Sequence, residues 1–92
     1  MQNDLTQELS ANFNDNDLIF CISGSLNSIS RKELIKKIRN KGWHVGDHVT
    51  EKTNYLICND INLNHTKVHN AIAYSIPIIT EEKIINMIEI IN

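Results

Sequence analysis

The stretch Leu18–Ile38, which reads LIFCISGSLNSISRKELIKKI, decides the fold. It opens with the apolar run 18–22, which has the length of a buried strand and ends where Gly24 permits a sharp change of direction. Ser30 and Glu33 then form an S-x-x-E capping box, after which apolar residues recur at helical spacing. The stretch therefore predicts a buried strand, a loop and a helix that Ser30 caps.

The rest of the sequence contains further apolar runs of strand length and further helices with capping residues. The first helix ends at Lys41-Gly42, and Thr80 caps a last helix whose first turn holds Glu81 and Glu82. Further strands are predicted at Trp43–Val45, Tyr55–Cys58 and Pro77–Ile79. A second helix is predicted around Val68, Ala71 and Ile72. The apolar side of the last helix is predicted to consist of Ile84, Ile85, Met87, Ile88 and Ile91. The strands are too apolar for either face of the sheet to be exposed to solvent, so we expect helices on both faces. The predicted fold class is α/β, with a small four-stranded parallel sheet flanked by three helices in the order β-α-β-β-α-β-α.

The length of 92 residues predicts one compact domain with a single core. Residues 1–17 are polar and acidic, and the spacing of Leu5, Leu9 and Phe13 allows a short amphipathic helix there. We therefore interpret 1–17 as an N-terminal extension and 18–92 as the domain.

Several classes of protein and site are not supported. The chain has no apolar run of about 18 residues and no signal-peptide pattern, so we expect a soluble, cytoplasmic protein without a membrane partner. Cys21 and Cys58 lie in apolar runs outside any CxxC pair, which favours reduced, packed thiols. The histidine pairs His44/His48 and His65/His69 are four residues apart, but no HExxH or Cys/His set completes a metal site. We expect neither metal nor cofactor.

Charge is segregated along the chain. Residues 1–17 sum to −4, residues 18–79 to +4 and residues 80–92 to −2. Six bases fall within the eleven residues from Arg31 to Lys41. This run could form a local positive surface for an anionic partner, but a charge run alone favours an ordinary solvated helix face.

A set of short motifs, in order, resembles the BRCT family, in particular the branch at the end of bacterial NAD-dependent DNA ligases and in the large subunit of replication factor C. The motifs lie between about 18 and 88, and they are Ser23-Gly24-Ser25-Leu26, Ser30-Arg31, Lys41-Gly42, Val49, Lys52-Thr53-Asn54-Tyr55-Leu56-Ile57, Thr66-Lys67, Ile76-Pro77-Ile78-Ile79 and Glu81-Glu82. Two positions depart from the family pattern. Trp43 stands where many members have the second glycine of a pair, and the last helix lacks a tryptophan near Lys83, as the ligase-like branch commonly does.

The resemblance implies a phosphate-binding site at Ser23, Gly24 and Lys67, with Arg31 added in the DNA-binding branch. A hydroxyl, a glycine N–H and cationic groups suit a phosphate, which carries up to about two negative charges and several acceptor oxygens. The residues alone favour an ordinary strand-to-loop turn at Ser23-Gly24, and for Lys67 and Arg31 taken singly they favour solvated surface charges. Candidates for contacts with the DNA backbone are Lys32, Lys36, Lys37 and Lys52.

Function is therefore predicted to be binding rather than catalysis. No GxGxxG, GxxxxGK[ST] or ligase-type KxDG motif occurs, and no base accompanies Ser23 or Ser25 as nucleophile. The leading hypothesis is a module, monomeric or weakly dimeric, that binds 5′-phosphorylated DNA ends or nicks in replication or repair. The alternative is a protein-interaction domain that binds a phosphopeptide or pairs with another BRCT domain.

Overall fold

A computed structural model describes residues 17–61 and 64–90. Almost all of the predicted N-terminal extension, and Ile91 of the last helix, lie outside the described residues. The elements, in chain order, are β1 (Ile19–Ile22), α2 (Arg31–Asn40), β2 (His44–Val45), β3 (Tyr55–Ile57), α3 (Thr66–Ala73), β4 (Ile78–Ile79) and α4 (Glu81–Ile90). This is the predicted order of strands and helices, with each strand shorter than expected.

The four strands form one parallel sheet in the order β2-β1-β3-β4. Phe20 pairs with Val45 on one side and with Tyr55 on the other, while Leu56 pairs with Ile78. Because all strands run in one direction, their carboxyl ends share one edge of the sheet, where loops leave β1 and β3. The predicted fold class is confirmed.

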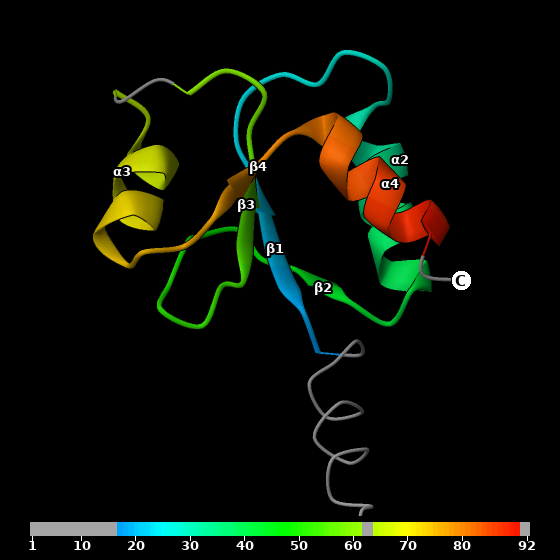
Figure 1. The fold of residues 1–92 in the computed structure, drawn as a ribbon, viewed down its shortest axis with the longest axis horizontal. Coiled ribbons are helices and arrows are strands. Elements are labelled where there is room, and N and C mark those ends of the chain that lie inside the picture. Colours follow the sequence, from blue (N-terminus) through cyan, green and yellow to red (C-terminus); the bar gives the residue numbers. More distant parts are fainter. Residues whose placement is uncertain (1–16, 62–63, 91–92) are drawn as a thin grey trace, which may run out of the picture.

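Helices cover both faces of the sheet, α3 on one face and α2 with α4 on the other (Figure 1). The core is accordingly divided in two, because successive side chains of a strand point to opposite faces. The core under α2 and α4 contains Phe20, Ile22, Leu34, Ile38, Trp43, Ile57 and Ile84. The core under α3 contains Cys21, Val49, Leu56, Cys58, Val68, Ala71 and Ile76, both cysteines being free thiols.

Two predicted caps are confirmed. The Ser30 hydroxyl accepts a hydrogen bond from the Glu33 N–H at 3.1 Å, and the Thr80 hydroxyl accepts one from the Lys83 N–H at 3.1 Å. The second helix is also where it was predicted, but Ile72 is 55% exposed, so Val68 and Ala71 alone bury its apolar side.

The turn after α2 shows how Trp43 replaces a second glycine. Gly42 alone adopts a left-handed conformation, with φ of 86°, which an L side chain rarely adopts. The Trp43 N–H donates to the Ile38 carbonyl of the helix end, so the strand begins one residue later than predicted, at His44. The Trp43 ring is buried, with its centroid 5.3 Å from that of Phe20.

Candidate functional site

Ser23 and Gly24 lie directly after β1, at the edge of the sheet where the strands end. The sheet still holds Ser23, whose N–H donates to the Ile57 carbonyl at 2.9 Å, and the residue is only 5% exposed. Gly24 is exposed and has φ of 80°, a conformation that favours glycine. Within residues 17–61 and 64–90, the Gly24 N–H has no hydrogen-bond acceptor. The chain therefore presents an open backbone donor beside a fixed hydroxyl.

Two cationic side chains meet at the same edge from different helices. Lys67 Nζ of α3 donates to the Ile22 carbonyl at 2.9 Å, and Arg31 Nη1 of α2 donates to the same oxygen at 3.2 Å. Arg31 Nη2 also donates to the Gly24 carbonyl at 3.1 Å. The structure thus brings together all four residues of the predicted phosphate site. We call Ser23, Gly24, Arg31 and Lys67 the strand-end cluster.

The strand-end cluster has an excess of positive charge. Neither Arg31 nor Lys67 forms an ion pair with a carboxylate in the described part of the chain. Two like charges that share one carbonyl oxygen repel each other, and a bound anion would relieve that repulsion. With the Ser23 hydroxyl and the Gly24 N–H, the cluster has the donors that suit a multiply charged oxyanion.

His65 contacts the strand-end cluster from the residue before α3. Its Nδ1 lies 3.3 Å from the Ser23 hydroxyl oxygen. No local pattern in the sequence indicates this contact, because Ser23 and His65 are 42 positions apart.

The four predicted backbone-contact lysines divide between different surfaces. Lys32 and Lys36 line a groove on α2, which we call the α2 groove; its full lining is Arg31, Lys32, Glu33, Ile35, Lys36, Arg39 and Asn40. Lys37 is exposed but does not line this groove. Lys52 lies shortly before β3, at the edge of the sheet where the parallel strands begin. The strand-end cluster lies at the opposite edge, where the strands end. Arg31 alone belongs to both the strand-end cluster and the α2 groove.

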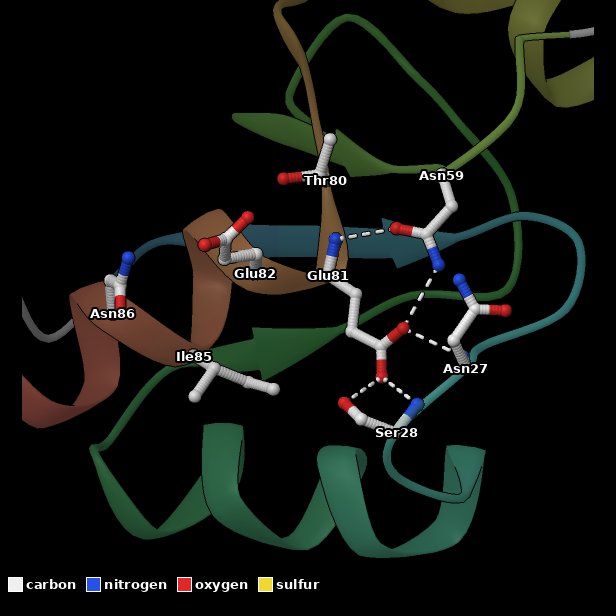
Figure 2. Close-up of a pocket in the computed structure, with 8 residues that line it drawn as sticks. All are labelled: Asn27, Ser28, Asn59, Thr80, Glu81, Glu82, Ile85 and Asn86. Atoms are coloured by element: carbon white, nitrogen blue, oxygen red, sulfur yellow. Dashed lines mark hydrogen bonds between the residues drawn. The ribbon is translucent and has the colours of Figure 1, made fainter.

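Glu81 has a role that sequence reasoning missed. It is the first residue of α4 and only 4% exposed, whereas its neighbour Glu82 is exposed. Its carboxylate accepts hydrogen bonds from the N–H groups of Asn27 and Ser28, both at 2.7 Å, and from the Ser28 hydroxyl at 2.6 Å. Figure 2 shows this carboxylate pointing at the loop that follows β1.

Asn59, just past the end of β3, completes the Glu81 cluster. Its side chain donates to the Glu81 carboxylate at 2.9 Å and accepts from the Glu81 N–H at 2.8 Å (Figure 2). The hydrogen bond from the Ser28 hydroxyl, followed by that from the Asn27 N–H, lowers the pKa of Glu81 from 4.5 to about 2. Glu81 is therefore ionised near neutral pH and ties the loop between Gly24 and Ser30 to the rest of the fold.

The hollow beside Glu81 is lined mainly by polar side chains. Its lining is Asn27, Ser28, Asn59, Thr80, Glu81, Glu82, Ile85 and Asn86. The Glu81 carboxylate is fully engaged by backbone, hydroxyl and amide donors, as ordinary structural carboxylates are. Across residues 17–61 and 64–90, no three His, Cys, Asp or Glu side chains gather in a way that would hold a metal ion. None of the helices in these ranges is long and apolar enough to cross a membrane.

Comparison with known proteins fits the fold and the motif order. Residues 16–88 match the model of the BRCA1 C Terminus (BRCT) domain. The chain belongs to the BRCT family. Within this BRCT match lie the whole sheet, helices α2 and α3, and most of α4.

Curated relatives carry the same BRCT segment within much longer proteins. The chain is 42% identical over 74 residues to a DNA ligase of Mycoplasmopsis synoviae, with 80% of this chain and 10% of the ligase covered. It is 35% identical over 71 residues to replication factor C subunit 1 of Oryza sativa subsp. japonica, with 77% of this chain and 7% of that protein covered. This BRCT chain therefore spans about a tenth of the length of the relatives it matches.

Proposed function

We propose that this chain is a non-catalytic module that binds the phosphate of a 5′-phosphorylated DNA end or nick through the strand-end cluster. The observation that carries the proposal is the Ile22 carbonyl, which receives hydrogen bonds from both Arg31 and Lys67. That oxygen holds two cations beside the Ser23 hydroxyl and the open Gly24 N–H. A terminal phosphate would meet all four donors at once.

A phosphate monoester suits this cluster better than a backbone phosphodiester does. A monoester carries about −1.5 to −2 charges near neutral pH and has three free acceptor oxygens. A backbone phosphodiester carries one charge. A monoester therefore offers the two cations more negative charge to neutralise, and it offers the hydroxyl and the N–H more oxygens as hydrogen-bond acceptors.

The α2 groove favours DNA as the carrier of the phosphate. Lys32, Lys36 and Arg39 are spaced so that they share one side of α2, and Arg31 joins this row to the strand-end cluster. A row of bases that leads away from a phosphate site suits the regularly spaced phosphates of a duplex. The single acid in the groove, Glu33, leaves it positive overall.

The names of the relatives agree with this proposal. DNA ligases and a replication factor C subunit are proteins of DNA metabolism, and this chain matches only a small part of each. The chain lacks the nucleotidyl-transfer KxDG motif, so we assign it binding rather than bond formation.

Titration of the ¹⁵N-labelled chain with a 5′-phosphorylated oligonucleotide duplex tests the proposed site. We expect the largest amide chemical-shift change at Gly24, because a phosphate oxygen would accept a hydrogen bond from its N–H. A duplex with a 5′-hydroxyl should leave the Gly24 amide near its free position. Shifts confined to α3 and β4, with Gly24 unmoved by either duplex, would contradict the site.

Lys36→Ala tests the α2 groove separately from the phosphate site. The variant should weaken binding of 5′-phosphate and 5′-hydroxyl duplexes by the same factor, and should reduce the slope of log affinity against log salt by about one. Fluorescence anisotropy over a salt series measures both quantities. Lys37→Ala is the comparison, since Lys37 is also a predicted backbone contact and is exposed on the same helix but does not line the groove; its effect on both quantities should be smaller. A loss of preference for the phosphate in Lys36→Ala would contradict this division of roles.

A further inference from the structure

His65 is placed to act on a ligand of the strand-end cluster. It occupies the cap position of α3 in an extended conformation, yet its side chain makes no capping hydrogen bond to the helix. Its ring instead approaches the Ser23 hydroxyl, and its Cε1 lies 4.0 Å from the position that a Cβ on Gly24 would occupy. The imidazole therefore borders the Ser23-Gly24 corner where the proposed phosphate would sit.

We propose that His65 is a further phosphate-binding residue, and that it couples binding of the 5′-phosphate to uptake of a proton by its ring. This inference rests on the proposed function. It adds an imidazole, which can gain a positive charge, to a cluster whose other cations are Arg31 and Lys67.

The coupling follows from the hydrogen bond between Ser23 and His65. When Nδ1 is unprotonated, it can accept the hydrogen of the Ser23 hydroxyl, which is then not available to a phosphate oxygen. When both ring nitrogens are protonated, Nδ1 donates to the Ser23 oxygen, and the hydroxyl hydrogen is free to point at the phosphate. The neutral tautomer with its proton on Nδ1 also frees the hydroxyl, but it adds no charge. The protonated ring also adds a positive charge beside the ligand. A phosphate therefore binds the protonated form better.

The surrounding charges support this direction. The cations of the same cluster are Lys67, from α3, and Arg31, from α2, and both are held at the Ile22 carbonyl beside Ser23. His69 lies one turn further along α3, and Asp60 lies in the loop after β3. In the described ranges no carboxylate forms an ion pair with His65. A bound phosphate dianion would place negative charge beside the ring and so favour its protonated form.

The pH dependence has two limits. Histidine side chains change charge between about pH 5 and 8, so the preference for a 5′-phosphate should fall as pH rises from 6.5 to 8.0. The second ionisation of a phosphate monoester has a pKa near 6, so the preference should also weaken below about pH 6. We therefore expect the ratio of affinities for 5′-phosphate and 5′-hydroxyl ends to be largest near pH 6.5.

The test measures this ratio by fluorescence anisotropy at pH 6.5 and 8.0, with fluorescein-labelled recessed-end duplexes that differ only in the 5′-phosphate. The loss of one charge-assisted hydrogen bond predicts that the wild-type ratio falls about tenfold between the two pH values. His65→Gln should give a lower ratio that is the same at both. His69→Gln, the matched control on the exposed side of α3, should behave as the wild type does. His65 is exposed, so both variants should fold, and their circular dichroism melts verify this.

The outcomes separate this inference from the proposed function. A wild-type ratio of one at both pH values would overturn the proposed function, and this inference with it. A wild-type ratio well above one whose fall with pH persists in His65→Gln would overturn only the role of His65. A pH dependence that disappears in His69→Gln instead would assign the proton to the other histidine and overturn this inference as well.

Discussion

Lys67→Ala is expected to lower the affinity for a 5′-phosphorylated DNA end by about tenfold to a hundredfold, while binding of the 5′-hydroxyl end changes little. The expected loss is that of one charge-assisted hydrogen bond, about 1.5 to 3 kcal/mol. Lys67 is half-buried, and its Nζ is fixed at 2.9 Å from the Ile22 carbonyl beside Ser23 and Gly24. Fluorescence anisotropy with the two duplexes measures both affinities.

Two further variants show whether the Lys67→Ala effect is specific to the strand-end cluster. Lys83→Ala removes an exposed lysine of α4 that belongs neither to the strand-end cluster nor to the α2 groove, and it should leave the preference for the phosphate intact. Ser23→Ala should act in the same direction as Lys67→Ala. Equal losses for phosphorylated and hydroxyl ends in Lys67→Ala would show that Lys67 contributes only general positive charge.

Glu81→Gln is expected to lower the free energy of unfolding by about 2 to 4 kcal/mol, because donors that now meet a carboxylate would lose charge-assisted hydrogen bonds. A glutamine places an NH₂ group where one carboxylate oxygen accepts hydrogen bonds from Asn27 and Asn59, or where the other accepts two from Ser28. Urea denaturation measures the difference. Glu82→Gln is the matched control, since Glu82 is exposed in the same helical turn, and it should change stability by less than about 0.5 kcal/mol. Similar losses in both variants would contradict a special role for Glu81.

The Glu81 effect should also depend on pH in a defined direction. The folded-state pKa of Glu81 is lowered from 4.5 to about 2, so the unfolded chain takes up the proton first as pH falls. The stability that Glu81 contributes is therefore fully present above about pH 4.5 and is lost as pH falls through about 2. The difference between wild type and Glu81→Gln should shrink over this window. A difference that stays constant from pH 6 to 2 would contradict an ionised, hydrogen-bonded Glu81.

Local signals in the sequence predicted most of the fold. Near neighbours in the chain determine the strand in the apolar run 18–22 and the helix caps at Ser30 and Thr80. These elements could therefore be predicted without knowledge of the tertiary structure. The errors lie at strand ends, where a single hydrogen bond decides the boundary. Trp43 was assigned to a strand, but its N–H bonds to the end of α2.

Long-range contacts explain what the sequence did not predict. Glu81 looked like a first-turn acid that favours the helix dipole, a local role. Its partners Asn27 and Ser28 are 54 and 53 residues away, and no local pattern connects them. The meeting of Arg31 and Lys67 was implied by the family resemblance, but their common acceptor is a backbone oxygen that no side-chain motif reveals.

The position of Lys52 illustrates the same limit. In the sequence it is one of several lysines in a basic region, and only the parallel arrangement of the strands shows that it lies at the edge of the sheet away from Ser23. The groups that gather at one edge depend on strand direction and order, which short-range periodicity indicates only indirectly.

The most direct test of the proposed function is the affinity of the wild-type chain for two recessed-end duplexes that are identical except for a 5′-phosphate or a 5′-hydroxyl, measured at low and moderate salt with a phosphopeptide pool as competitor. A terminal phosphate held by the strand-end cluster predicts tighter binding of the phosphorylated end at both salt concentrations, with little displacement by the peptides. Equal affinities for the two ends would contradict recognition of a DNA end. Complete displacement by phosphopeptides at concentrations near that of the DNA would contradict it as well, and would favour a protein partner.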